Sequence, residues 1–212
     1  MSESAPNLRE RRRIAVERDL VDRARRATAE RGLSGYTVEE LCEDAGISRR
    51  TFFNYFASKE DAVLGIPLHR DDTDADERFL SGRTHADDEI STTLLEDLVQ
   101  LVAARWETMN VSPDTVNALR AAVDREPRLL ARALEHAFAS EKSIRALVEQ
   151  REGWPAGDLR AAAAVQVVDA LARAATTEFL GSDSHEPFPR ILARRVHAAR
   201  SLFATQTFGG KP

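Results

Sequence analysis

The sequence predicts an all-α protein of about nine helices, with a three-helix N-terminal domain containing a helix-turn-helix and a larger helical C-terminal domain. Three observations favour this fold class. Apolar residues recur at helical spacing along most of the 212 residues, capping residues open several of these segments, and no strand-like alternation persists. Apolar residues make up 42% and charged residues 31% of the chain, an ordinary composition for a globular protein.

The first predicted helix covers residues 9–31, and Gly32 is expected to end it. Its start is basic, with four arginines at Arg9, Arg11, Arg12 and Arg13. Residues 1–60 carry 12 Lys/Arg against 11 Asp/Glu, whereas the remaining residues carry 18 against 24. The chain has a net charge of −5, so it is not expected to coat nucleic acid through bulk charge, but a local basic surface remains compatible with it. The arginine cluster is either a basic arm or a solvated helix start.

The next segment has the layout of a helix-turn-helix. Thr37 followed by Glu40 has the form of a capping box and opens a short helix, which Gly46 breaks. Ser48 caps a second helix that runs to Phe56. Five apolar residues are expected to lock the two helices together: Leu41, Ala45, Ile47, Phe52 and Phe56.

A further short helix begins after Ser58, and Pro67 is expected to end or kink it. Residues 70–78 are rich in closely spaced charges and are expected to form an exposed linker. The predicted domains are therefore residues 1–66 and residues 67–212.

Five helices are predicted in the second domain, over residues 88–109, 112–124, 127–151, 158–180 and 187–206. The first is expected to bury a stripe that runs from Leu95 through Leu98 to Trp106. The last two are the predicted interface of a homodimer, because the alanine-rich surface of residues 158–180 permits close approach between helices.

Other features exclude several classes of protein. The first residues lack the apolar stretch of a signal peptide, and no apolar run approaches the roughly 20 residues of a membrane-spanning helix. Cys42 is the one cysteine, which favours a reducing compartment, so a cytoplasmic location without membrane contact is expected. The histidines show no metal-ligand spacing, and no phosphate loop or nucleophile elbow is present. Neither an enzyme nor a cofactor or metal site is predicted.

The helix-turn-helix suggests contact with double-stranded DNA. Arg49 and Arg50 lie in the first turn of its second helix, from which they can reach guanine O6/N7 or phosphate. Thr51, Asn54 and Tyr55 add polar donors. A structural hairpin with a solvated charged face is the alternative that this pattern alone leaves open.

Residues 37–61, with Ala-Gly-Ile-Ser before the second helix, Thr-Phe-Phe-Asn-Tyr-Phe within it and Ser-Lys-Glu after it, resemble the signature of the TetR family of bacterial regulators. The resemblance covers about residues 10–65. It implies a homodimer, about nine helices, a DNA-binding head and an effector-binding body. It also implies that effector binding changes the spacing of the two heads and releases DNA.

The resemblance assigns roles by position. Arg49, Arg50 and Asn54 correspond to base-reading positions. Phosphate contacts are implied at the polar residues Thr37, Thr51, Tyr55 and Lys59, and Ser48, the cap of the second helix, is counted among the DNA-binding residues. Lys59 opposes the dipole of the helix whose first turn it occupies, and a phosphate there would relieve this. Phe53 departs from the family pattern, in which many members have tyrosine, so it is expected to pack against sugar or a thymine methyl group.

Residues 120–180, with Glu126-Pro-Arg-Leu-Leu-Ala-Arg132 and the alanine-rich helix, are similar to a TetR subgroup whose C-terminal domain is associated with acyl-CoA-like ligands. Four residues are candidates for lining such a pocket: Trp106, Met109, Leu134 and Phe138. The alternative is that these residues belong to an ordinary hydrophobic core.

Together these features predict a sequence-specific DNA-binding transcriptional regulator. The predicted activity is that of a repressor, released from a palindromic operator by a small apolar or acyl-CoA-like effector. The alternative is a helical ligand-binding module or scaffold that does not bind DNA.

Overall fold

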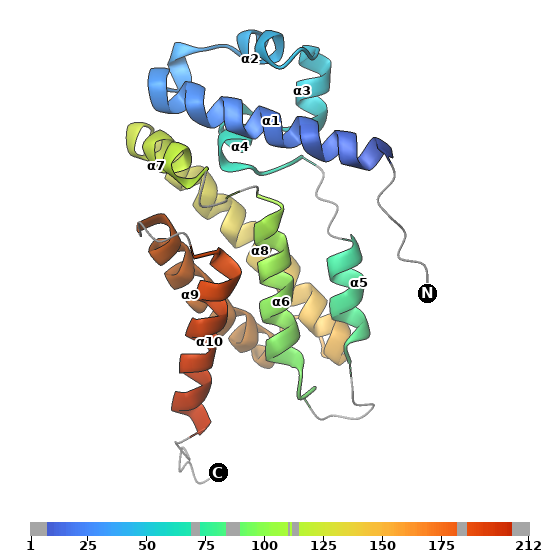
Figure 1. Ribbon diagram of the computed structural model, residues 1–212. Helices are drawn as coiled ribbons and strands as arrows, with labels where there is room; N and C mark the ends of the chain where they lie inside the picture. The colour runs from blue at the N-terminus through green and yellow to red at the C-terminus, as the bar shows by residue number, and fades with distance from the viewer. Residues whose placement is uncertain are drawn as a thin grey trace. The chain divides into compact units, whose positions relative to one another are not determined.

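The computed structural model describes residues 8–68, 73–83, 90–109, 111, 115–181 and 186–204. These residues form ten α-helices and one short 3₁₀ helix, and no strand occurs among them (Figure 1). The all-α prediction is therefore confirmed. The helix count exceeds the expected nine because one additional helix lies where a linker was predicted.

The helices divide into two compact units, and each contains segments from distant parts of the chain. The first unit comprises residues 1–70 and 108–136, and the second comprises residues 71–107 and 137–212. The predicted division of the domains at residue 66 stays a prediction. Helix α8 (Arg128–Glu152) begins in the first unit and continues into the second.

The first unit is built around α1 (Leu8–Arg31), which packs along α4 (Lys59–Leu64) and α7 (Val116–Arg125). Leu20 and Ala24 on α1 are fully buried. Arg25 lies on the same face and is also fully buried, which the sequence pattern did not indicate.

Arg25 ties three segments of the first unit together. Its Nε donates to the carbonyl oxygen of Val63 at 2.9 Å, and a terminal nitrogen donates to that of Met109 at 3.0 Å. Burial lowers the pKa of Arg25 to about 10, so the guanidinium stays charged at neutral pH. Beside it, Gly65 has a φ of 71°, and a Cβ there would lie 2.2 Å from the Met109 oxygen. Only glycine suits this close approach.

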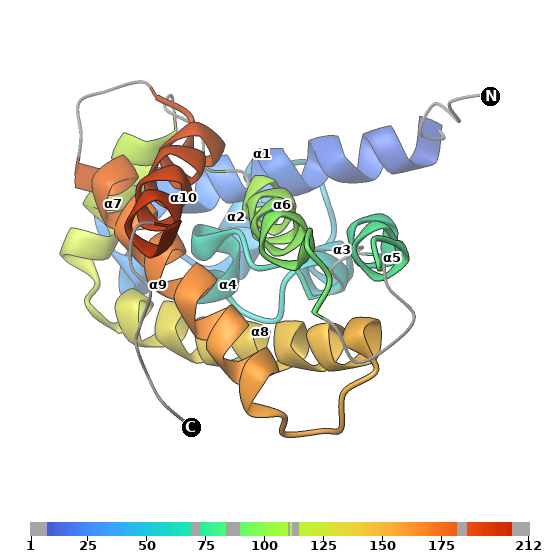
Figure 2. The ribbon, with the colours of Figure 1, turned by 90° about the horizontal axis from the view of Figure 1, so that it is seen from below.

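The second unit contains α5 (Thr73–Ser81), α6 (Leu94–Glu107), α9 (Leu159–Gly181), α10 (Phe188–Ala204) and the C-terminal part of α8. Helices α9 and α10 lie side by side, and α6 packs against both (Figure 2). The hydrophobic core of the second unit includes Leu98, Val148 and Val165, all nearly inaccessible to solvent. None of the described helices is long and apolar enough to cross a membrane.

The prediction of an exposed linker over residues 70–78 is wrong for residues 73–78, which belong to α5. Phe79 anchors this helix in the core of the second unit. Asp76 accepts a hydrogen bond from Arg105 of α6 at 3.0 Å, so a charge expected to be solvated is paired instead. Residues 70–72 lie outside the described residues.

The expected start and inward face of the next helix also need correction. Helix α6 begins at Leu94, so the expected helix is wrong for residues 90–93, while residues 88 and 89 lie outside the described residues. Leu95 is exposed, whereas Leu94, Leu98 and Leu101 are buried. The predicted stripe was therefore wrong for Leu95, which it placed on the buried face of the helix. Helix α7 begins at Val116, and residues 112–114, where its start was expected, lie outside the described residues.

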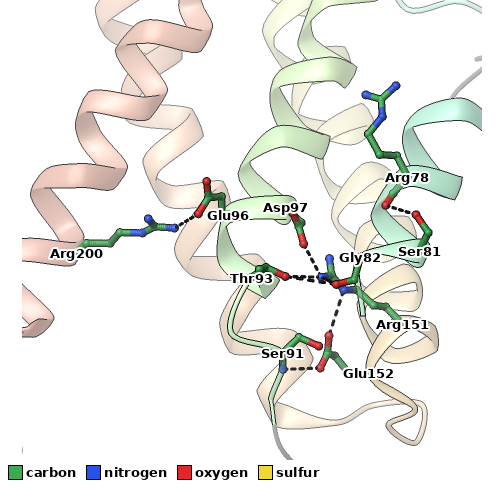
Figure 3. A network of polar contacts seen from close by, with 10 residues as sticks. All are labelled: Arg78, Ser81, Gly82, Ser91, Thr93, Glu96, Asp97, Arg151, Glu152 and Arg200. Atoms are coloured by element: carbon green, nitrogen blue, oxygen red, sulfur yellow. Dashed lines mark hydrogen bonds and ion pairs between the residues drawn. The ribbon is translucent and has the colours of Figure 1, made fainter. Parts of the chain in front are cut away.

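A buried arginine joins three segments of the second unit. The side chain of Arg151, near the end of α8, donates to the carbonyl oxygen of Gly82 at 2.8 Å and to Asp97 at 2.5 Å (Figure 3). It also lies 3.3 Å from a carboxylate oxygen of Glu152, whose other oxygen accepts from the backbone N–H of Ser91 at 3.0 Å. These contacts hold both ends of the segment between α5 and α6.

We expect Arg151→Met to lower the free energy of unfolding by about 3 kcal/mol, because it leaves Asp97 and the buried Glu152 without their cation. The matched control is Arg200→Met, which removes an exposed pair with Glu96 and should change stability by about 0.5 kcal/mol or less. Urea unfolding of both variants measures this. Equal, small effects would contradict a structural role for the buried network.

Candidate nucleic-acid interface

The first helix of the helix-turn-helix, α2 (Val38–Asp44), begins with the predicted capping box. The Thr37 hydroxyl accepts from the backbone N–H of Glu40 at 3.1 Å, and the Glu40 carboxylate accepts from that of Thr37 at 3.1 Å. Both contacts satisfy N–H groups that the helix itself cannot use. Thr37 is exposed at this N-terminus.

A tight turn then leads to α3 (Arg49–Tyr55). Gly46 has a φ of 65°, and the N–H of Ile47 donates to the carbonyl oxygen of Cys42 at 2.9 Å. Ser48 caps α3 by accepting from the N–H of Thr51 at 3.0 Å. The expected N-cap is confirmed here, as is that of Ser58 on α4.

Two phenylalanines anchor the inner face of α3. Phe52 and Phe56 are fully buried, with ring centroids 6.0 Å apart. Leu41 on α2 is also buried, whereas Ala45 and Ile47 are only half-buried. Cys42 is a buried free thiol whose pKa is raised by burial, which suits packing rather than reactivity.

The outer face of α3 carries the predicted base-reading residues. Arg49, Arg50 and Asn54 are exposed, as is Phe53, whose ring packs edge-on against Phe52 at 5.3 Å. Because α3 turns Phe52 into the core, the opposite side of the helix faces solvent. The structure therefore brings these four residues together on one accessible surface.

The other expected contacts lie at the edges of this surface. Ser48 is exposed, while Thr51 and Tyr55 are half-buried. The Thr51 hydroxyl lies 2.8 Å from that of Ser48, so these two form a local hydrogen bond in the free protein.

Lys59 has partners inside the protein. Its ammonium donates to the carbonyl oxygens of Leu33 at 2.5 Å and Tyr36 at 2.6 Å, and it lies 4.6 Å from the centre of the Tyr36 ring. It thereby holds the 3₁₀ helix η1 (Leu33–Gly35) against the start of α4. The phosphate contact expected of Lys59 stays a prediction. The hydrogen bonds to Leu33 and Tyr36 show that this side chain also stabilises the fold.

Sequence reasoning missed three polar residues that join helices of the first unit. Glu126 accepts from the N–H of Leu33 at 2.7 Å. Arg132 donates to both carboxylate oxygens of the buried Asp61, at 2.7 and 3.1 Å, and these hydrogen bonds raise the pKa of Arg132. Glu39 pairs with Arg49. All three contacts join residues on different helices, and no local pattern signals them.

The expected basic arm is only partly described. Arg11 and Arg12 are exposed, and Arg13 lies 3.5 Å from Glu17. The side chain of Arg9 lies outside the described residues. The contribution of this cluster to DNA contact stays a prediction.

The four expected pocket residues are divided between the two units, with Met109 and Leu134 in the first and Trp106 and Phe138 in the second. Leu134 and Phe138 are exposed. Trp106 stacks on Phe188 with ring centroids 4.0 Å apart. A small cavity of about 30 Å³ between α5 and α6 has none of these four residues in its lining.

Comparison with known proteins agrees with the geometry of the first unit. Residues 20–64 match the family described as "Bacterial regulatory proteins, tetR family". The chain is also similar to the HTH-type transcriptional regulator TcmR of Streptomyces glaucescens, with 28% identity over 181 residues that cover 83% of this chain and 78% of TcmR. The similarity extends well beyond the helix-turn-helix.

We expect Lys59→Met to lower the free energy of unfolding by about 1.5 kcal/mol, because two carbonyl oxygens lose a charged donor. Urea unfolding measures this, with Lys142→Met on the exposed surface of α8 as the control. No loss of stability would contradict the structural task of Lys59. The salt dependence of DNA binding tests the phosphate contact separately, since losing one contact lowers the slope of log K against log salt by about 0.9.

Proposed function

The chain belongs to the TetR family of bacterial regulatory proteins and is a DNA-binding regulator of transcription rather than an enzyme, and on that premise we propose that it acts as a repressor, binding a palindromic operator as a homodimer. The observation that carries this proposal is the outer face of α3. Arg49, Arg50 and Asn54 are exposed there, while Phe52 and Phe56 are buried behind them. A cytoplasmic location, where operator DNA is accessible, accords with this role.

Helix α3 is proposed to enter the major groove. Arginine can donate two hydrogen bonds to O6 and N7 of guanine, and asparagine can pair with N6 and N7 of adenine. Arg49, Arg50 and Asn54 therefore supply base contacts, and Phe53 offers an apolar edge to a thymine methyl group. The polar residues at both ends of the helix-turn-helix, together with the backbone N–H groups of its N-termini, position the phosphates.

The phosphate contacts are assigned to Thr37, Ser48, Thr51, Tyr55 and Lys59. Thr37 and Ser48 are exposed N-cap residues, so their hydroxyls and the N–H groups that follow lie where an anion binds a helix. Lys59 keeps its hydrogen bonds to the carbonyl oxygens of Leu33 and Tyr36, and its positive charge attracts a phosphate beside them.

The homodimer is proposed to form through α9 and α10. Ala163, Val167 and Ala170 are exposed along one face of α9, and Leu202 is exposed on α10. Small side chains on α9 permit close packing of a second copy, and a two-fold interface pairs the same surface on both subunits. Such symmetry presents two α3 helices to two half-sites.

The effector is proposed to be a small apolar or acyl-CoA-like molecule that binds outside the helix-turn-helix. Trp106, which is half-buried and packs on the buried rings of Phe179 and Phe188, is the aromatic candidate for this site in the second unit. Phe138 and Leu134 are exposed apolar side chains on α8. Thermal unfolding with a panel of acyl-CoA thioesters and apolar drugs tests this, since a ligand at 100 times its Kd should add about 2.7 kcal/mol of stability.

Selection of bound DNA from a random library should recover a palindrome with half-sites about one helical turn apart. On that duplex, Arg49→Ala should cost about 1–3 kcal/mol and relax the preference at one base pair of each half-site. Lys142→Ala, at an exposed cation on α8, is the control and should leave binding unchanged.

The binding constant of the wild-type protein should fall steeply with salt, as phosphate contacts require. A salt-insensitive affinity would contradict the proposed interface. Uniform weakening by Arg49→Ala on every duplex would make Arg49 a phosphate contact instead of a base reader.

Val167→Glu should weaken the dimer by more than about tenfold, because like charges placed opposite each other cost several kcal/mol. Sedimentation equilibrium measures the dissociation constant, with Gln100→Glu on the exposed surface of α6 as the charge-matched control. A Val167→Glu variant that dimerises as the control does would contradict the placement of the interface on α9.

A further inference from the structure

Arg49 is held by two partners in the free protein. Its Nε lies 3.1 Å from a carboxylate oxygen of Glu39 on α2, and its guanidinium carbon lies 5.4 Å from the centre of the Phe53 ring. Arg49 and Phe53 are one helical turn apart on α3, so their contact follows from helix geometry, whereas the contact with Glu39 crosses from one helix to the other. We refer to these three residues as the Glu39–Arg49–Phe53 triad.

Glu39 contributes little to the stability of the fold through its pair with Arg49. Its side chain is 59% exposed, and that of Arg49 is 65% exposed, so their ion pair contributes little to stability. The capping box of α2 uses the neighbouring Glu40, not Glu39. A carboxylate is also a poor choice for a surface that approaches phosphates, because it repels them.

We propose that Glu39 is a specificity-determining residue that makes DNA contact by Arg49 selective for base edges over phosphates. The proposal rests on the proposed function of α3 as the helix that reads the operator. In the free protein, Glu39 and Phe53 hold the guanidinium on the outer face of the helix-turn-helix. A DNA group that contacts Arg49 must therefore tolerate the negative charge of the neighbouring carboxylate.

A guanine edge and a phosphate differ in how they meet this requirement. Guanine O6 and N7 carry no net charge, so the guanidinium can contact them while the carboxylate stays nearby. A phosphate brought to Arg49 would carry its negative charge toward Glu39, and the repulsion offsets part of the attraction. Glu39 therefore weakens non-specific binding more than specific binding, which raises the ratio between the two affinities.

The test compares Glu39→Gln with the wild-type protein on the duplex recovered by selection and on a random duplex, each across a range of salt concentrations. Glu39→Gln should bind the random duplex about two- to five-fold more tightly, the size expected for an exposed ion pair. The ratio of specific to non-specific affinity should fall. The slope of log K against log salt on random DNA should steepen by about 0.9, because Arg49 gains a phosphate contact.

Two controls isolate the role of Arg49. Glu43→Gln removes the same charge from an exposed position on α2 and should leave both the ratio and the slope near their wild-type values. In an Arg49→Ala background, Glu39→Gln should no longer change the ratio, because the residue through which Glu39 acts is gone. A purely structural effect would lower the unfolding midpoint instead, and thermal unfolding of each variant detects this.

Three results would overturn the proposal. The first is an unchanged ratio in Glu39→Gln, and the second is a change that Glu43→Gln reproduces. The third is an effect that persists without Arg49, which would mean that Glu39 contacts a base or repels phosphate on its own. A wild-type protein with no preference for any duplex would contradict the proposed function itself, which distinguishes that failure from a failure of the present inference.

Discussion

The burial of Phe52 and Phe56 is the interaction on which the rest of the DNA-binding surface depends. Phe52 lies on the inner face of α3, a helix only seven residues long, and Phe56 is the residue that caps its C-terminal end, with the two ring centroids 6.0 Å apart. With both positions inside, Arg49 and Phe53, and likewise Arg50 and Asn54, must form outward-facing pairs one turn apart. Apolar packing on one face thus determines which polar groups the other face presents.

Polar contacts around this core give the short helices a fixed geometry. Thr37, Ser48 and Ser58 each satisfy a backbone N–H group at a helix start. Lys59 and Glu126 both hold η1 in place. Lys59 donates to the carbonyl oxygen of Leu33, and Glu126 accepts from the N–H of the same residue. Helices of six or seven residues are marginal alone, so these contacts and the buried rings must supply their stability. A protein with a net charge of −5 can still present a local surface with two exposed arginines in this way.

Local signals in the sequence predicted most of the first unit. Caps, turn glycines and apolar spacing depend on neighbours within a few residues, and the structure confirms the capping box, both serine caps and the buried aromatic pair. Buried charges were not predictable in the same way. Arg25 and Arg151 are buried because carbonyl and carboxylate groups far away in the sequence accept their hydrogen bonds. Residues 73–78, expected to be part of a linker, form α5 because Phe79 packs into the core of the second unit and Asp76 pairs with Arg105 of α6. The pairing of Glu39 with Arg49 crosses the turn and has no signature in either segment.

Methylation of DNA by dimethyl sulfate tests the central claim most directly, because the reagent attacks guanine N7 in the major groove and adenine N3 in the minor groove. With α3 in the major groove, the bound protein should protect guanine N7 at two symmetric positions about one helical turn apart. Arg49→Ala, at a concentration that restores full occupancy, should expose one of the protected guanines in each half-site. Full occupancy with every guanine N7 reactive, or with protection confined to adenine N3, would contradict the account.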